Sequence, residues 1–145
     1  MKAAEWLKRG AEAADPFDAL SNYWRGFNNL FAGKGRERDL ISAFIRACIE
    51  EQFAAGLLDA HAKEAHALLS QPVKDMRGSG RDTSPFMEQF AEAATELEKL
   101  VALFMVIYQV RCNFEHGQKS PSRGRDEALC TAACPFVAKV VDHAA

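Results

Sequence analysis

An arginine and a histidine lie five positions apart at the end of a long apolar segment. The segment covers residues 97–110 and leads into a polar stretch that contains Arg111, Asn113 and His116. Imidazole changes its protonation state near neutral pH, so His116 is suited to general acid–base catalysis. The guanidinium of Arg111 stays charged and offers a planar set of donors to phosphate oxygens. These side-chain types are suited to acid–base chemistry beside a phosphate group, but their spacing must first allow them to meet.

Helix geometry sets a condition on this pair. Five positions advance ~500° in a straight helix, so the side chains of Arg111 and His116 diverge by about 140°. They converge if the helix ends between them, for which Gly117 is a suitable C-cap residue, or if a second copy of the chain supplies its own pair. A structural alternative pairs Arg111 with Glu115 and places His116 against the last carbonyls of the helix. Spacing alone favours this structural interpretation.

Helical periodicity extends to the N-terminal part of the chain. Residues 2–14 favour a short helix and form an N-terminal helical extension within residues 1–15. Asp15 and Pro16 are typical of the N-cap and first position of a helix. Apolar residues at spacings of three and four then predict a second helix over residues 17–31.

The middle of the chain predicts one more helical region and then a loop. A third helix is expected to begin at Asp39, to bend near Gly56 and to continue through residues 57–69. Residues 71–85 combine proline, glycine and serine with mixed charge, which is typical of a mobile loop. We therefore expect this loop to separate two helical halves.

The C-terminal half predicts two helices that hold the candidate site. Ser84 and Pro85 are expected as N-cap and first residue of a long central helix ending at Gly117. A last helix is expected from Asp126 onward, with a kink or a displaced start at Pro135. No stretch alternates as a strand does. All 145 residues are therefore predicted to form one all-α domain, an up-down bundle of four to five helices.

Composition limits the classes of partner and compartment. The formal net charge of −2 does not indicate nucleic-acid binding by the whole molecule, so any such binding requires a local patch. No apolar run approaches the ~18 residues that span a bilayer, and the N-terminus does not resemble a signal peptide. Four cysteines without a secretory signal predict free thiols and a cytoplasmic location.

The cysteine and histidine spacings do not predict a metal site. Cys130 and Cys134 lie one helical turn apart but lack further ligands at the spacing of a zinc finger. His61 and His66 are separated by five positions, not by the four that favour a shared metal on one helix face. We expect the two thiols to be small buried side chains and the two imidazoles to lie on a surface.

Residues 108–117, Tyr-Gln-Val-Arg-Cys-Asn-Phe-Glu-His-Gly, resemble the Arg-x4-His signature of HEPN domains, particularly of the abortive-infection-like group. The resemblance extends to the asparagine-bearing helix around residues 23–31 and to the loop containing Lys119, and it covers roughly residues 17–140. It implies a helical bundle that dimerises so that two Arg/His pairs face one shared cleft. Many HEPN domains are endoribonucleases that work without a metal ion.

The resemblance also implies roles for individual residues. Arg111 and His116 would form the active-site pair, with Asn113 as support and no cofactor. Residues 111–125 contain four cationic side chains and one carboxylate, and this local excess of positive charge could guide a phosphodiester. The expected substrate-binding residues are Lys119, Arg123, Arg125 and Asn28. Cys112 departs from the family pattern, because catalytic members often carry a polar residue directly after the arginine.

Three functions therefore remain open. The leading expectation is a homodimeric, metal-independent endoribonuclease with RNA as substrate, in a toxin, phage-defence or stress setting, with a protein inhibitor or antitoxin as a further partner. The second is a catalytically inactive HEPN module that binds RNA, a nucleotide or a protein. The third is a helical bundle whose central helix is capped and carries no active site.

Overall fold

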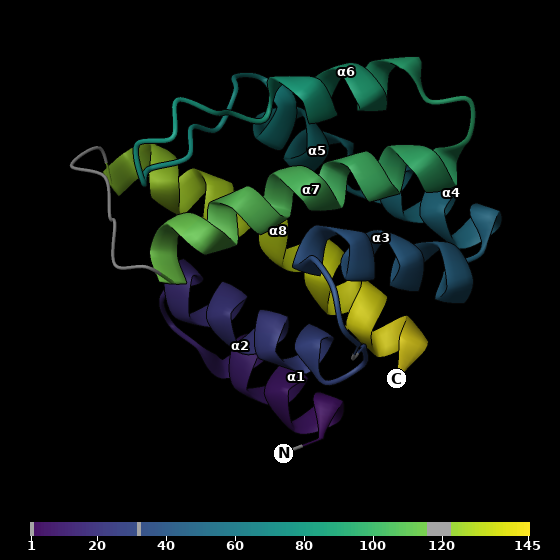
Figure 1. The fold of residues 1–145 in the computed structure, drawn as a ribbon. Helices are drawn as coiled ribbons and strands as arrows, with labels where there is room; N and C mark the ends of the chain where they lie inside the picture. Colours follow the sequence, from purple (N-terminus) through teal and green to yellow (C-terminus); the bar gives the residue numbers. More distant parts are fainter. Residues whose placement is uncertain (1, 32, 116–122) are drawn as a thin grey trace.

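The structure is a computed structural model that describes residues 2–31, 33–115 and 123–145. These residues form eight helices and no strand, which confirms the all-α prediction (Figure 1). The helices are more numerous than the four or five expected, because two predicted helices are each divided. They are α1 (Ala3–Glu12), α2 (Pro16–Asn28), α3 (Glu37–Cys48), α4 (Glu51–Ala60), α5 (Ala62–Leu69), α6 (Ser84–Glu92), α7 (Glu96–Glu115) and α8 (Arg123–Ala144).

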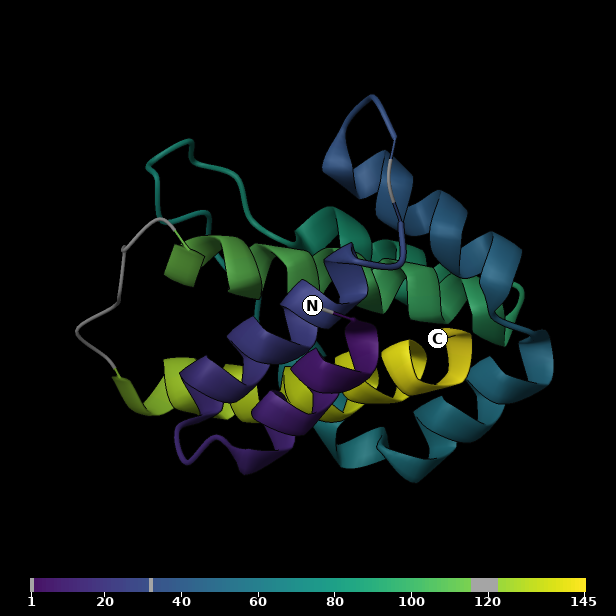
Figure 2. The same ribbon diagram turned by 90° about the horizontal axis from the view of Figure 1, so that it is seen from below.

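The start of α2 agrees with the local sequence signal. The carboxylate of Asp15 accepts a hydrogen bond of 2.8 Å from the backbone N–H of Phe17, and Pro16 is the first helical residue. This arrangement satisfies one of the N–H groups that a helix start leaves without a partner. Helix α2 packs between α1 and α8 (Figure 2), and the ring of Tyr23 lies against Gly10, where any larger side chain would overlap it.

The third predicted helix is divided at positions without a helix-breaking residue. Helix α3 begins at Glu37, before the expected Asp39, and ends where Ile49 adopts an extended backbone. Gly56, the expected bend, lies inside α4. The second interruption falls at His61, which separates α4 from α5. Ile49 is buried, so burial of its side chain accompanies the change of direction.

The predicted single helix from Pro85 to Gly117 is wrong. Ala93 is extended, and α6 packs against α7 as its antiparallel neighbour (Figure 1). The carboxylate of Glu51, on α4, accepts hydrogen bonds from the backbone N–H groups of Glu96 (2.6 Å) and Leu97 (3.2 Å). Glu51 therefore satisfies two N–H groups of the first turn of α7 from a distant helix, and the hydroxyl of Thr95 accepts a further hydrogen bond of 3.2 Å from the N–H of Glu98. The expected cap also differs, since Ser84 is the first residue of α6 and Thr83 precedes it.

Helices α7 and α8 form the centre of the fold and run in opposite directions (Figures 1 and 2). Helix α8 begins at Arg123, before the expected Asp126, and contains Pro135 in its interior. The core between the helices includes the fully buried side chains Trp24, Phe27, Leu100, Leu103, Phe104, Ile107 and Phe136. Burial of these side chains fixes the position of the C-terminal turns of α7, which carry the candidate site.

The loop between α5 and α6 has its own hydrogen-bonded structure. Lys74 and Asp82 form an isolated antiparallel bridge, and the backbone N–H of Asp75 donates to the carbonyl of Arg81 (2.9 Å). The buried hydroxyl of Thr83 accepts a hydrogen bond of 2.8 Å from the N–H of Val73. The chain thus doubles back on itself between residues 73 and 83. None of the described helices is long and apolar enough to cross a membrane.

Candidate functional site

Arg111 lies near the C-terminal end of α7 and faces α2 and α3. Its side chain is 19 % exposed, with Nη1 4.0 Å from a carboxylate oxygen of Glu37. The guanidinium carbon lies 5.7 Å from the centre of the Trp24 ring, a distance suited to a cation–π contact. These contacts orient a permanently charged group at the edge of the core.

A cavity of about 520 Å³ separates α2 from this end of α7 and brings together two of the predicted site residues. Arg111 and Asn28 both line it. The other lining residues are Phe17, Asp18, Leu20, Ser21, Trp24, Arg25 and Phe114. The volume is within the usual range of sites for small molecules, which combine apolar walls with a few polar groups. The cavity therefore has the size and the mixed lining of a ligand site.

Two aromatic contacts show how the cavity is arranged along its length. The rings of Phe17 and Phe114 meet edge to face with centroids 4.8 Å apart. Trp24 contacts Arg111 one turn earlier on α7. The beginning of α2 therefore lies against the end of α7, and the two helices run in opposite directions. An aromatic pair forms one end of the cavity, and the guanidinium lies further along it.

The indole of Trp24 carries a buried polar atom at this position. Its side chain is 1 % exposed, and its Nε1 is buried without a hydrogen-bond partner in the part of the chain that the structure describes. A buried N–H that lacks an acceptor costs about 1–3 kcal/mol. The fold tolerates this cost next to the cavity, where Trp24 supports the guanidinium.

Asn113 lies on the opposite side of α7 and does not line the cavity. Its side chain is buried, and its Oδ1 accepts hydrogen bonds from the N–H of Met76 (3.2 Å) and from Nε2 of Gln109 (3.0 Å). Its Nδ2 donates to the carbonyl of Lys74 (3.0 Å). Both ends of the amide thus hold the loop between α5 and α6 against α7. The structure does not bring Asn113 together with Arg111.

The other predicted residues divide into two groups. Arg125 donates to the carbonyls of Gln71 (3.3 Å) and Pro72 (3.4 Å), so it ties the start of α8 to the loop and is not part of the cavity lining. His116 and Lys119 lie outside the described residues, as does the side chain of Arg123. The expectations for these three residues therefore stay predictions.

Arg38 is a half-buried cation that no local sequence pattern indicates. It donates to the carbonyl of Met105 (2.8 Å) and to Oε1 of Gln109 (3.3 Å). Its guanidinium carbon lies 4.6 Å from the ring centre of Phe86 and 4.7 Å from that of Tyr108. Burial lowers the pKa of Arg38 from its ordinary value. Its partners lie far away in the sequence, so no local pattern could have revealed them.

Glu37 connects this cluster to Arg111. The hydroxyl of Tyr108 donates to Oε2 of Glu37 at 3.2 Å, while the other carboxylate oxygen faces Arg111. Burial raises the pKa of Tyr108, so this side chain remains a neutral hydrogen-bond donor at neutral pH. Helix α3 therefore helps to orient the guanidinium from the side opposite the cavity-lining helix α2.

The cysteines lie mostly in apolar surroundings. Cys112 and Cys130 are buried, and burial raises the pKa of Cys134 to about 12. A thiol with a raised pKa is a poor metal ligand and a poor nucleophile at neutral pH. Among the described residues no group of three or more histidine, cysteine or acidic side chains is placed to hold a metal ion.

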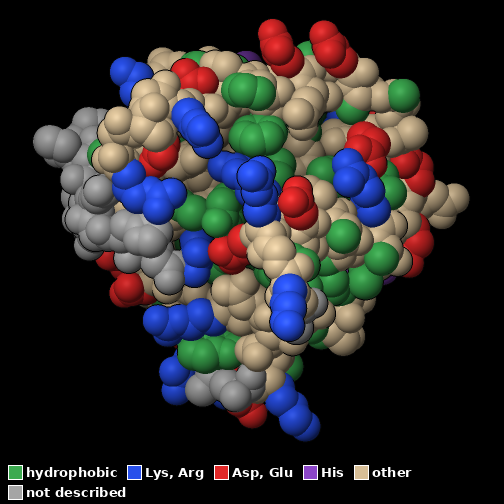
Figure 3. Space-filling model, viewed as in Figure 1, with side chains coloured by type: hydrophobic (Ala, Val, Ile, Leu, Met, Phe, Trp, Pro, Cys, Tyr) green, Lys and Arg blue, Asp and Glu red, His purple; other side chains and the backbone are tan. Residues whose placement is uncertain are grey.

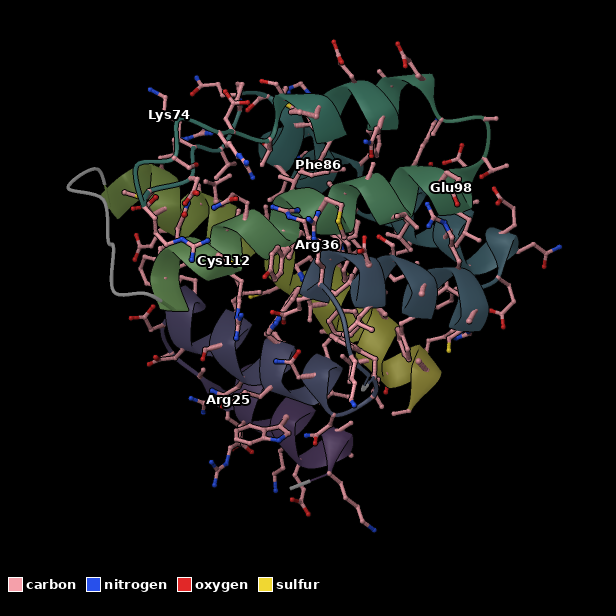
Figure 4. The ribbon with its side chains drawn as sticks, viewed as in Figure 1. Arg25, Arg36, Lys74, Phe86, Glu98 and Cys112 are labelled. Atoms are coloured by element: carbon pink, nitrogen blue, oxygen red, sulfur yellow. The ribbon has the colours of Figure 1, made fainter. Side chains whose placement is uncertain are left out.

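Basic side chains occur on the face of the molecule shown in Figure 3, interspersed with apolar and acidic groups. Figure 4 labels three of them on separate elements, namely Arg25 on α2, Arg36 at the start of α3 and Lys74 in the loop before α6. Lys74 and Arg25 lie on opposite sides of α7 in this view. The formal net charge of the chain is −2.

Comparison with protein-family models, with curated proteins and with solved structures gave no match for this chain.

Proposed function

We propose that the chain is a HEPN-like, metal-independent endoribonuclease that acts as a homodimer. The single observation that carries the proposal is the position of Arg111, whose oriented guanidinium lines a cavity of about 520 Å³ at the end of the central helix. His116 is the next residue in the sequence after Glu115, the last residue of α7. The resemblance of residues 108–117 to the Arg-x4-His signature supplies the reaction class.

The chemistry needs no metal ion if the two side chains share the work. The 2′-hydroxyl of the RNA loses a proton and attacks the neighbouring phosphorus, and the departing 5′-oxygen gains a proton. Imidazole is suited to both transfers near neutral pH. The guanidinium stabilises the negative charge that develops on the phosphorane oxygens. His116 is therefore assigned acid–base catalysis and Arg111 transition-state stabilisation.

A dimer completes this scheme, because one chain holds a single Arg/His pair while the reaction uses both a base and an acid. In the proposed HEPN arrangement, two copies place their pairs in one cleft. Asn28 on the cavity wall, together with Lys119, Arg123 and Arg125, is assigned to substrate binding. A toxin-like, phage-defence or stress role, controlled by a protein inhibitor, is proposed from the resemblance alone, and a cytoplasmic setting from the cysteines.

The test is cleavage of single-stranded RNA in excess EDTA by the wild type, Arg111→Ala and His116→Ala. We expect cleavage by the wild type to survive chelation and each variant to lose about 100- to 1,000-fold in rate. Gel filtration of the wild type should give the size of a dimer. Intact RNA that the wild type retains would favour a catalytically inactive binding module. Equal cleavage by all three proteins would exclude Arg111 and His116 as the active pair.

Mixing the two inactive variants tests the shared site directly. A mixed dimer keeps one arginine and one histidine in the shared cleft but lacks the second acid–base group, so we expect cleavage above that of either variant and well below that of the wild type after subunit exchange. A site contained within one chain would give no recovery. Each variant alone, incubated at the same total concentration, is the matched control.

A further inference from the structure

The cavity between α2 and α7 has features that the proposed cleavage chemistry does not use. Cleavage requires a cation and an acid–base group, whereas the cavity also contains an aromatic pair and a row of polar side chains. Phe17 and Phe114 form one end, and both rings are only half-buried. Unpaired RNA bases are commonly bound by stacking on such rings. The apolar end of the cavity is therefore chemically suited to a base.

The polar side chains are arranged along one stripe of α2. Asp18, Ser21, Arg25 and Asn28 follow one another at spacings of three and four, so they share a helix face, and all four line the cavity. Asp18 and Ser21 are both exposed. Asp18 directly follows Phe17 in the sequence, and Ser21 lies one helical turn further on, so both are near the aromatic end of the cavity. A carboxylate accepts hydrogen bonds but does not donate them when ionised. Asp18 therefore favours a partner that presents N–H groups.

The cations lie further along the same cavity. Arg111 is one helical turn before Phe114 on α7, and Arg25 lies two turns after Asp18 on α2. Guanidinium groups bind phosphate oxygens with paired, charge-assisted hydrogen bonds. The order along the cavity is thus aromatic rings and carboxylate first, then guanidinium groups. A nucleotide has the same order, with a flat base that carries N–H groups joined through ribose to a phosphate.

We propose that this cavity is a specificity subsite that takes one unstacked base of single-stranded RNA against the Phe17–Phe114 pair and beside Asp18, with the adjoining 3′-phosphate at Arg111. This inference rests on the proposed function, because it places the base next to the phosphate that is cleaved. The carboxylate of Asp18 accepts hydrogen bonds from N–H groups of the base. Guanine presents two adjacent donors, N1–H and its exocyclic amino group, to one carboxylate, whereas adenine, cytosine and uracil each present one donor group on this edge, so Asp18 acts as a residue that selects guanine.

Binding of the four nucleoside 3′-monophosphates tests the subsite without any cleavage. The chain has two tryptophans, so Trp6→Phe leaves Trp24 on the cavity wall as the sole indole fluorophore and keeps an aromatic ring beside Arg25, whose guanidinium carbon lies 5.2 Å from the Trp6 ring centre. In this background we expect saturable changes in emission, with guanosine monophosphate binding about ten-fold more tightly than the other three nucleotides. Inorganic phosphate is the probe for binding at the guanidinium groups alone, and it should bind more weakly than any of the four.

Asp18→Asn in the same background should abolish the preference for guanosine monophosphate while binding of inorganic phosphate stays unchanged. Asp39→Asn is the matched control, because it also removes an exposed carboxylate from the first turn of a helix and lies outside the cavity. The control should keep the preference. Equal binding of all four nucleotides, a preference that survives Asp18→Asn, or no saturable signal would each overturn the subsite.

The two proposals fail in distinguishable ways. A base preference that depends on Asp18, found in a protein that leaves RNA intact, would remove the nuclease and keep the subsite. RNA cleavage that depends on Arg111 but shows no base preference in solution would keep the nuclease and overturn the subsite. Mapping the cleaved ends for the wild type and Asp18→Asn gives the second readout, since a working subsite changes where the RNA is cut.

Discussion

The two sides of the C-terminal half of α7 use polar side chains in different ways. On one side, Asn113 is buried and its amide makes hydrogen bonds of 3.0–3.2 Å to the loop before α6 and to its own helix. On the other side, Arg111 is held by an aromatic ring and by a carboxylate 4.0 Å away, and it lines a cavity.

The difference separates a structural role from a binding role. The Asn113 amide is enclosed, and its hydrogen bonds join two segments of the same chain. The Arg111 guanidinium is oriented by its neighbours and still lies on the wall of a cavity of about 520 Å³. Residues two positions apart on one helix point in directions that differ by ~200°, so a single helix end serves both purposes. We interpret Asn113 as an anchor of the loop and Arg111 as the group that meets a substrate.

The largest expected effect on stability comes from the Asn113 side. Asn113→Ala should lower the free energy of unfolding by about 2 kcal/mol, because it leaves the N–H of Met76 and the carbonyl of Lys74 without their partner. Urea unfolding followed by circular dichroism measures this change. Trypsin should also cut faster at Arg77 and Arg81 in the variant, since the loop loses its attachment to α7.

The control for that substitution is Asn22→Ala on α2. Asn22 makes one hydrogen bond, from its amide to the carbonyl of Asp18 four residues earlier, and this bond is exposed. We expect a change below about 0.5 kcal/mol. A loss for Asn113→Ala no larger than that of Asn22→Ala would contradict the anchoring role.

A smaller loss of stability is expected at Asp15, the N-cap residue of the cavity-lining helix α2. Asp15→Ala removes the side-chain cap of α2 and should destabilise the protein by about 1 kcal/mol. Asp39→Ala, which does not cap its helix, should change stability by less than half of that value. Equal urea midpoints for Asp15→Ala and the wild type would show that the cap does not contribute.

The smallest expected effect lies at the other end of α7. Arg46 donates two hydrogen bonds to the carboxylate of Glu98 at 2.7 and 2.8 Å, and these bonds lower the pKa of Glu98. A lowered folded-state pKa stabilises the protein at neutral pH, and this contribution disappears as the pH falls through the folded-state pKa. Both side chains are about half exposed, so the pair contributes only a few tenths of a kcal/mol.

Urea unfolding of the wild type and Glu98→Gln at two pH values measures that contribution. The wild type should be slightly more stable at pH 7, and the two proteins should have the same stability once the pH is below the lowered folded-state pKa of Glu98, where the carboxyl is protonated. Added salt should reduce the difference at pH 7. A difference that grows as the pH falls would contradict the ion pair as its source.

The helical class and the start of α2 could be predicted from the sequence because their causes are local. Periodicity identifies the apolar faces, and Asp15 with Pro16 marks a helix start by its own chemistry. The division between α6 and α7 has only a partial local signal. Its sequence, Ala93-Ala94-Thr95, contains neither glycine nor proline; Thr95 followed by Glu98 matches a local helix start, but two further acceptors come from Glu51 on another helix.

The candidate site shows the same limit. The position of Arg111 directly after an apolar segment can be read from the sequence, and Asn28 belongs to the asparagine-bearing helix on which the resemblance rests. Arg111 and Asn113 point in opposite directions from α7, and Arg125 donates hydrogen bonds to loop carbonyls. Both arrangements depend on which segments pack against each other in the fold. The aromatic end of the cavity joins Phe17 to Phe114 across most of the chain, and no spacing rule connects them.

The central claim is that Arg111 meets substrate while Asn113 holds the fold. The most direct measurement is the rate of RNA cleavage in EDTA by Arg111→Ala and Asn113→Ala, at a low temperature where both variants are folded. The account predicts that Arg111→Ala loses about 100- to 1,000-fold in rate with little loss of stability, whereas folded Asn113→Ala stays within about ten-fold of the wild type. Wild-type cleavage by folded Arg111→Ala, or a loss for Asn113→Ala as large as that for Arg111→Ala, would contradict it.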